Sequence, residues 1–598
     1  MAAVRRGHSP LKVDLATAHP SDLPPISALF LIYFDIKAGY TIGWKRSVPG
    51  VELEGVVEYK SLPSGLHTVK EDLIYFVHEN HAGLSAFVNA PADEESRNAR
   101  MIAVGIMVPL SYGRLGRSWK HAEKLKEMAS ELILDTAKTQ VLEAYWEQHK
   151  MEDKTTQKES DSINSPSDVR YEAAEPLTTG KAKSSGRNRS ISDGHALHPQ
   201  TLSKYHPAWS LPDLLDIFGP LIFPIHRAAL LRKRILITGH TPVEQTCNFV
   251  YDLSILSNIP LAVIDLLPSA TPPQRLRPLF SIGVHDIPLL EEDLKVSRKS
   301  ATSGSMPEEN DETSKGWIAC TTDSILAMKS KLYDVLITMP APYSSSASQK
   351  VWPKVESPQG VELRATQRDL RRYKALRWGL SRSNHPNSPD TPDEARSSSF
   401  SHNPIARDDP MLDIPDTDLI VEPLSWSALA YSGFMWWASA GEGQRLDIDA
   451  EADSDSALLS GLSLTAHTPS TGMDTTSPRP TATQETAIIA YFHRLTTQYL
   501  TTIADIVDAA DATDEDEEPE HSGESGQLLR SSTSRGPEDE DVPSGPTMYV
   551  TSGDMGRLGL DVWSMSDHGF VEDVARLYFG MKAQVECKNV DICGVRIC

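Results

Sequence analysis

The side chains best placed for chemistry lie in the stretch "TGHTP", which runs from Thr238 to Pro242. The apolar run Ile235–Ile237 before it predicts a buried parallel strand, and apolar residues at helical spacing after it predict a helix. Such a turn binds phosphate when several free backbone N–H groups point at the ligand. Here one glycine is followed by a histidine and by a proline, which has no N–H. We therefore predict a connecting loop in which Thr241 caps the following helix, and not a nucleotide site.

Other groupings of reactive side chains lack the spacing that their chemistry needs. His78 and His81 stand three residues apart, without the H-E-x-x-H pattern or a nearby third ligand, and are predicted to close a helix. The sequence contains no G-x-S-x-G motif for a nucleophilic serine. Its five cysteines contain no C-x-x-C pair, so they indicate neither a disulfide framework nor a zinc site. We expect no catalytic residue, no metal and no cofactor.

Composition narrows the class of protein. A hydrophobic content of 39% and a mean hydropathy of -0.33 are low for a chain of 598 residues that is folded throughout, so we predict long disordered insertions. The net charge of -24 argues against nucleic-acid binding. The cysteines suit a reducing cytoplasm, and residues 1–20 lack the apolar core of a secretory signal. The apolar stretch Trp426–Gly441 is shorter than the roughly 20 residues of a membrane span, which predicts a buried helix or strand pair and no transmembrane segment.

The elements that must position any site begin with a region at residues 24–150. Alternating side chains predict a hairpin of strands Leu29–Phe34 and Tyr40–Lys45, with Lys37 at its turn and Trp44 on its second strand. A short helix is expected at residues 67–79, strands at 83–89 and 101–110, and a long amphipathic helix from Ser118. This pattern indicates a small α/β domain with an antiparallel sheet.

Strands alternate with helices at residues 203–342, which predicts a mostly parallel sheet covered on both faces. Expected strands lie at residues 235–238, 259–268, 277–288, 316–321 and 332–340. The loops Gly239–Thr241 and Cys320–Asp323 follow two of them, so we predict that they are neighbours at an edge where α/β sheets form crevices. Asp323 either faces a partner there or caps the helix that starts at Ser324.

The rest of the chain, residues 343–590, predicts helices at 363–380, 485–510 and 571–585 between polar inserts. Segments 151–202, 384–412, 443–482 and 512–545 are expected to be mobile. The helix at 363–380 carries Arg368, Arg371 and Arg372, and we favour packing of its apolar side, with solvated charges, over contact with an anionic membrane. Ser190 and Ser192 in "GRNRSIS" each follow an arginine by three residues, a spacing that basophilic kinases accept.

The three regions at residues 24–150, 203–342 and 343–590 together resemble a known protein family. "ALFLIYFDIKAGYTIGWK", a linker, "FGPLIFPIHRAALLRKRILITG" and "GWIACTTDSILAMKSKLYDVLI" are similar to the tripartite DENN module, and "LSWSALAYSGFMWWASAGE" is similar to its LCHN-like branch and fungal relatives. The resemblance implies a longin-like upstream domain at 24–150, a disordered linker at 151–202, a central DENN domain at 203–342 and a mainly helical downstream region at 343–590.

The resemblance also implies a function. DENN proteins of this kind promote guanine-nucleotide exchange on a Rab-type small GTPase by holding its switch loops away from the nucleotide and Mg²⁺. Candidate GTPase-binding residues are Lys37, Trp44, His240, Thr241, Thr322 and Asp323. A trafficking scaffold without exchange activity remains an alternative, whereas the missing phosphate loop disfavours a nucleotide hydrolase on the central sheet. We expect a cytoplasmic protein and leave open a peripheral association with membrane surfaces.

Overall fold

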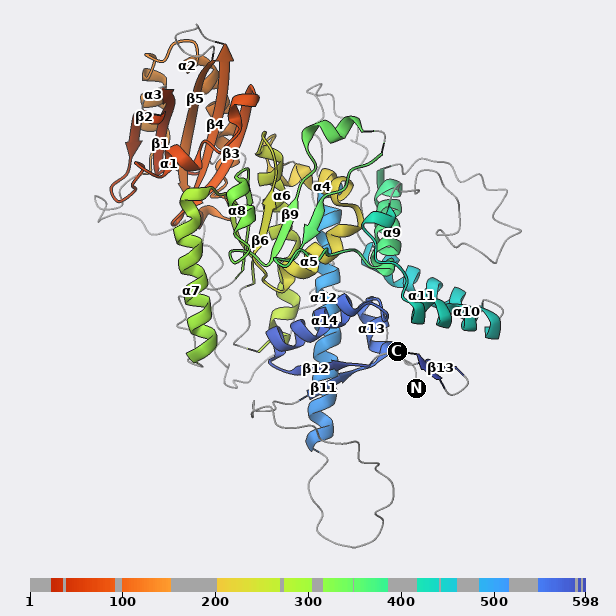
Figure 1. Ribbon diagram of the computed structural model, residues 1–598. Coiled ribbons are helices and arrows are strands. Elements are labelled where there is room, and N and C mark those ends of the chain that lie inside the picture. The colour runs from red at the N-terminus through yellow and green to blue at the C-terminus, as the bar shows by residue number, and fades with distance from the viewer. Residues whose placement is uncertain are drawn as a thin grey trace, which may run out of the picture.

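The computed structural model describes residues 23–35, 39–91, 99–151, 202–268, 274–303, 316–347, 349–384, 417–439, 442–459, 483–515, 547–586, 590–592 and 595–597. A ten-stranded mixed sheet forms its centre, helices pack against this sheet, and a helical region lies beside it (Figure 1). This arrangement confirms the predicted mixed α/β class. Lys37, Ser190 and Ser192, with nearly all of the 151–202 linker, lie outside the described residues.

The strands of the large sheet run in the order β10-β9-β6-β8-β7-β3-β4-β5-β1-β2. Their bounds are β1 Ala28–Asp35, β2 Gly39–Ser47, β3 Glu71–His78, β4 His81–Pro91, β5 Ala99–Pro109, β6 Ile235–Thr238, β7 Arg277–Ser281, β8 Trp317–Thr321, β9 Val335–Thr338 and β10 Lys354–Glu356. Strands β1 to β5 pair antiparallel and form a first lobe, whereas β6 to β9 pair parallel in a central lobe. The lobes meet where Phe76 of β3 pairs with Phe280 of β7.

The first lobe contains the predicted hairpin, in which Leu31 of β1 lies opposite Trp44 of β2. The prediction of a helix at residues 67–79 is wrong, because most of this segment forms β3, which pairs with β4 along its whole length. Only its first two residues are helical, as the end of the 3-10 helix Leu66–Thr68. His78 and His81 therefore face each other across a hairpin turn and do not close a helix. The single long helix expected from Ser118 is a 3-10 turn followed by two helices, α2 Ala122–Leu132 and α3 Gln140–His149. A short helix, α1 Val57–Lys60, follows β2.

The central lobe contains helices α4 Leu211–Phe218, α5 Ile222–Leu230, α6 Glu244–Leu256, α7 Ile287–Ser303 and α8 Ser324–Met328. Helix α6 packs on β7, β8 and β3, and thus covers the seam between the lobes. Residues 259–268 do not form the predicted strand; Leu261–Leu266 is a 3-10 helix that packs against helix α12, Thr483–Glu515, of the downstream region. One helical stretch among the described residues, Pro207–Leu230, is long and apolar enough to cross a membrane, but 72% of its most apolar window is buried in the protein.

The downstream region contains helices α9 Gln367–Asn384, α10 Trp426–Ser439, α11 Glu442–Leu459, α12 Thr483–Glu515, α13 Ser552–Leu558 and α14 Met565–Val574, with two small sheets of β11 Thr547–Val550 with β12 Lys582–Val585, and of β13 Val590–Ile592 with β14 Val595–Ile597. Helix α12 contacts α4, α6, α9 and α11 and ties this region to the central lobe (Figure 1). The prediction that residues 443–482 are mobile is wrong for the first part of this segment, because residues up to Leu459 belong to α11.

Arg368 and Arg372 of α9 are buried and Arg371 is only partly exposed, contrary to the prediction that these charges are solvated. Arg368 donates two hydrogen bonds to Asp455 of α11, at 2.7 and 2.8 Å, and Arg372 donates to the same carboxylate at 3.1 Å. Arg371 is paired with Glu451 of α11 at 2.8 Å. The basic side of α9 thus faces an acidic helix of the same chain, which leaves these cations engaged in packing α11 against α9.

Candidate partner-binding surface at the junction of the lobes

The carboxyl ends of β6 and β8 bring two of the predicted loops together. Thr238 and Thr321 are register partners in the two parallel strands, and the backbone N–H of Gly239 donates to the carbonyl of Thr321 at 3.0 Å. The following residues, His240 and Thr322, therefore leave the sheet at the same edge. His240 is exposed, whereas Thr322 is half-buried and its hydroxyl makes no hydrogen bond among the described residues.

A loop of the first lobe, residues 61–68, lies against this edge. The hydroxyl of Thr241 donates to the carbonyl of Gly65 at 3.1 Å and lies 3.1 Å from the hydroxyl of Thr68. The hydroxyl of Ser64 donates to the carboxylate of Asp323. We call the loops 239–241 and 321–323 together with the loop 61–68 the junction edge. Thr241 and Asp323 thus bind their own chain across the lobes, and His240 is left facing solvent.

Neither Thr241 nor Asp323 caps a helix with its side chain. Asp323 stands at the N-terminal end of α8, but its carboxylate accepts a hydrogen bond from the backbone N–H of Val284 at 3.2 Å. Helix α6 begins at Glu244, two residues later than the sequence predicted, and its first N–H groups are bound by Asp72 of β3. Asp72 accepts from Val243 at 2.7 Å and from Glu244 at 3.1 Å, so a strand of one lobe caps a helix of the other.

Two further contacts join the lobes beside the junction edge, and sequence reasoning missed both. The ammonium group of Lys60, at the end of α1, pairs with buried Asp286 and donates to the carbonyl of Val77 at 3.0 Å. The ring of Tyr59 stacks on His285 with 3.7 Å between the ring centroids. Partners more than 200 residues apart leave no local pattern in the sequence. The Pro- and Gly-containing stretch after Lys60 was the only available signal that a loop starts here.

Because the carboxyl group of Asp72 is buried, the stability that its contact with helix α6 provides should depend on pH. Burial raises the pKa of Asp72 to about 6, although hydrogen bonds from Val243, Glu244 and Leu73 lower it. The carboxyl group of Asp72 therefore holds its proton more tightly in the folded protein than in the unfolded chain. The resulting contribution to the free energy of unfolding is fully present below pH 3.8, the ordinary pKa, and is lost as pH rises through about 6. The free energy of unfolding of the wild type should fall over this pH range, and we expect Asp72→Asn to make that fall smaller by at most about 3 kcal/mol.

Urea unfolding of the wild type and of Asp72→Asn at a series of pH values between these limits measures the effect. Groups that titrate in both proteins cancel in the difference between the two free energies of unfolding. A wild type that gains stability relative to the variant as pH rises would show that the three N–H groups outweigh burial.

Trp44, the other predicted site residue that the structure describes, lies far from the junction edge. Trp44 is half-buried in the edge strand β2, where the guanidinium carbon of Arg46 lies 5.3 Å from the centre of its ring. Six strand spacings of about 4.8 Å separate β8 from β2, a distance of about 29 Å along the sheet. The hairpin that carries Trp44 and the junction edge are therefore two separate surfaces (Figure 1).

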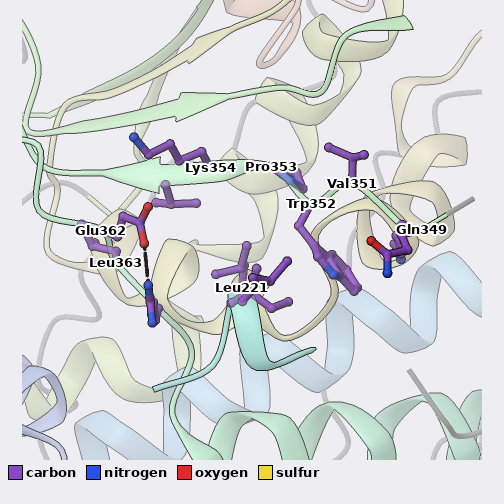
Figure 2. A pocket seen from close by; sticks show the side chains of 13 residues that line it. Leu221, Gln349, Val351, Trp352, Pro353, Lys354, Glu362 and Leu363 are labelled. Carbon is purple, nitrogen blue, oxygen red and sulfur yellow. Dashed lines mark hydrogen bonds and ion pairs between the residues drawn. The ribbon is translucent and has the colours of Figure 1, made fainter. Parts of the chain in front are cut away.

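A groove of about 310 Å³ lies at the opposite end of the sheet, beside β10 (Figure 2). Leu221, Val355 and Leu363 give it an apolar lining, and an ion pair of Arg364 with Glu362 at 2.8 Å stands at its side. The ring of Trp352 also lines it, with the ammonium of Lys350 3.8 Å from the ring centre. The groove suits a small apolar group, but it shares no residue with the junction edge.

The side chains of the junction edge are suited to binding a partner. Within the described parts of the chain, no three His, Cys, Asp or Glu side chains gather as a metal ion would require. Exposed apolar side chains adjoin the edge, because Ile325 and Met328 of α8 face solvent just after Asp323. The arrangement presents a polar edge and an apolar helix face, held in place by hydrogen bonds between two lobes.

Comparison with known proteins places both lobes in one family. The family described as DENN domain-containing protein 11 matches residues 29–349, and a domain of unknown function, DUF4484, matches residues 421–598. DENN domain-containing protein 11 of Danio rerio is 32% identical over 314 residues, which cover 52% of this chain and 53% of that protein. The Rattus norvegicus protein is 30% identical over 321 residues, 52% of this chain and 57% of its own length.

A fungal relative is similar over a longer range. Protein ANR2 of Saccharomyces cerevisiae is 20% identical over 616 residues, which cover 96% of this chain and 95% of that protein. The chain thus matches only about half the length of the vertebrate relatives. The match at residues 29–349 nevertheless takes in more than half of this chain and both lobes. It confirms the resemblance to DENN proteins, and the chain belongs to the DENN domain-containing protein 11 family.

Proposed function

We propose that the protein is a guanine-nucleotide exchange factor for a Rab-type small GTPase. It binds the GTPase, holds the switch loops away from the nucleotide and Mg²⁺, and so stabilises the nucleotide-free state by differential binding. Membership of the DENN family, over a match that spans both lobes, is the observation that carries the proposal. We also propose that the protein acts in the cytoplasm, in membrane trafficking, with recruitment to membrane surfaces.

The junction edge is our proposed GTPase-binding surface. An exchange factor must keep its own surface rigid while it deforms the partner, because ordering loops on binding costs free energy. Loops 239–241 and 321–323 meet this need, since Thr241 and Asp323 are hydrogen-bonded to the first lobe. Exposed His240 and the apolar side chains Ile325 and Met328 are then available to the GTPase. The hairpin with Lys37 and Trp44 is a second candidate surface.

We expect His240→Glu to slow exchange at least about tenfold if the imidazole lies in a closely packed interface, because a buried unpaired carboxylate costs several kcal/mol there. The measurement is release of a fluorescent GDP analogue from each member of a Rab panel, with wild-type protein and variant. Gln584→Glu is the matched control, because it adds the same charge at an exposed position of β12 in the downstream region. Thermal unfolding midpoints should be equal in all three proteins.

Two outcomes would count against the proposal. Release that stays at the intrinsic rate for every Rab protein, with binding detected by a pull-down, would favour the scaffold without exchange activity. Exchange that is unchanged by His240→Glu but lost in Lys37→Glu would move the binding surface from the junction edge to the hairpin of the first lobe.

A further inference from the structure

Helix α10 exposes a continuous apolar stripe to solvent. Trp426, Leu429, Gly433 and Trp436 follow one another at intervals of three and four residues and so lie on one face of the helix. Trp426 is 86% exposed, Leu429 45% and Trp436 63%, and a side-chain carbon added to Gly433 would meet no atom within 4 Å. The length and composition of this stretch predicted a buried element, and the structure corrects that prediction. Exposed patches with large aromatic residues mark interaction sites.

The opposite face of α10 holds the helix on the protein. Ala428 is buried there, and the ring of Tyr431 packs on Trp563 with 5.4 Å between the ring centroids. Packing of this face fixes the direction in which the stripe points. The tryptophans are therefore exposed by the fold itself, since their helix is anchored by its other side.

The charges around the stripe limit what can cover it. Residues 417–439 contain no lysine or arginine, and their only charged residues are Asp418 and Glu422. The neighbouring helix α11 contains six acidic residues and one cation, Arg445, and its carboxylates at Asp449 and Asp453 are exposed. Glu451 and Asp455 of the same helix are already paired with arginines of α9. An anionic surface would be repelled here, while an uncharged one would not.

The shape of the region also favours one kind of partner. Helices α10 and α11 project from the body of the protein, with α10 at the outer end (Figure 1). A convex, uncharged helix with tryptophan at both ends of its exposed stripe fits the headgroup level of a bilayer, where indole rings place an apolar body and a polar N–H. A protein partner would instead have to supply a groove.

We propose that α10 inserts its Trp426–Trp436 stripe into the interface of a neutral, zwitterionic membrane. The insertion is driven by burial of apolar surface and opposed by negative lipid charge. This assigns a membrane-contacting role to a helix in the part of the chain that matches a domain of unknown function. It does not rest on exchange activity, because the contact needs no GTPase.

Flotation of the full-length protein with phosphatidylcholine vesicles tests the proposal. We expect binding that persists at raised ionic strength and weakens when phosphatidylserine is added. The variant Trp426→Ser with Trp436→Ser should lower the partition coefficient about tenfold or more for each tryptophan. Leu134→Ser is the matched control, since Leu134 is 81% exposed in the first lobe, and it should bind as the wild type does.

Phosphatidylcholine with brominated acyl chains provides a second readout. The chain has 11 tryptophans, and only those that enter the membrane should be quenched by bromine. Bromine should quench tryptophan fluorescence in the wild type but not in the double variant. The thermal unfolding midpoint of the double variant should equal that of the wild type, because both replaced residues are exposed.

Several results would overturn the proposal. Absence of flotation with neutral vesicles, or equal flotation of wild type and double variant, would remove the stripe from membrane contact. Binding that requires phosphatidylserine and is abolished by salt would indicate a basic surface elsewhere. A wild-type dimer in analytical ultracentrifugation that dissociates in the double variant would assign the stripe to a second copy of the chain.

Discussion

Replacing Arg227 with methionine should lower the free energy of unfolding by about 3–5 kcal/mol. The guanidinium of Arg227 in α5 donates to the two carboxylate oxygens of Asp369 in α9, at 2.8 and 2.7 Å. It also lies 3.2 Å from the carboxylate of Asp567 in α14. All three side chains are buried, and they join the central lobe to two helices of the downstream region. Methionine keeps most of the volume but leaves two carboxylates in the core without their cation.

The matched control is Arg234→Met. Arg234 also forms a two-oxygen pair with an aspartate, Asp334, at 3.0 and 2.7 Å, but both side chains are partly exposed. We expect a loss of about 1 kcal/mol or less there, because solvent replaces the lost partner. Urea unfolding of the three proteins measures both losses. Equal losses would show that burial of the Arg227 cluster adds nothing to its contribution.

The pH dependence of the Arg227 variant provides an independent check. Burial raises the pKa of Asp567 to about 7, even beside Arg227, while the pKa of Asp369 stays below its ordinary value because the charge and hydrogen bonds of Arg227 outweigh burial. Without the arginine both carboxyl groups should hold protons more tightly in the folded protein. The deficit of Arg227→Met should therefore shrink as pH falls below about 7, since protonation removes the uncompensated charge.

Local patterns predicted the elements whose own residues mark them clearly. The hairpin of β1 and β2 shows in the alternation of residues 29–45, and the buried strands β6, β8 and β9 show as short apolar runs between helices. From these strands the adjacency of the loops after Thr238 and Thr321 followed as a property of parallel sheets.

Elements decided by their partners could not be predicted in the same way. Residues 71–78 have apolar side chains that suit a helix as well as a strand, and pairing with β4 and β7 selects the strand. The long-range contacts of the candidate site belong to the same class. Asp72 caps a helix 171 residues later in the chain, and Lys60 binds an acid 226 residues later. A single sequence shows charged residues at such positions but not which of them meet.

The arginines of α9 show why the composition of a helix can predict the exposure of its charges wrongly. A helix with arginines on one side is expected to solvate them, because long charged side chains rarely lie inside a protein. Here Asp455 of the opposing helix α11 pairs with both Arg368 and Arg372, and these three charges are buried together. Glu451 of α11 pairs with Arg371, and this second pair is partly exposed. Residues of α11 looked like part of a polar insert, which hid the partner of the basic helix.

Replacing Gly559 with alanine should lower the free energy of unfolding by about 2–4 kcal/mol, from left-handed backbone strain and overpacking together. Gly559 ends α13 with φ of +68°, a conformation that L side chains rarely adopt. A Cβ atom there would lie 2.1 Å from Nη2 of Arg372. Arg372 is fully buried and donates to Asp455 at 3.1 Å, so moving its guanidinium group away from the new Cβ would disturb this buried ion pair.

Gly556→Ala is the matched control, three residues earlier in the same helix. Its Cβ would meet no atom within 4 Å, and alanine in place of glycine inside a helix stabilises by up to about 1 kcal/mol. The two alanine variants should therefore shift the thermal midpoint in opposite directions.

A double-mutant cycle separates the two causes of the Gly559 effect. In the background of Arg372→Met the guanidinium is absent, so the added Cβ should cost only the backbone strain of about 1–2 kcal/mol. The coupling energy then measures the close approach of α13 to the buried arginine. An equal cost of Gly559→Ala in both backgrounds would assign the whole loss to the backbone and show that Arg372 yields to the new side chain. A smaller cost beside methionine would mean that this glycine is required because the arginines of α9 occupy the core of the downstream region.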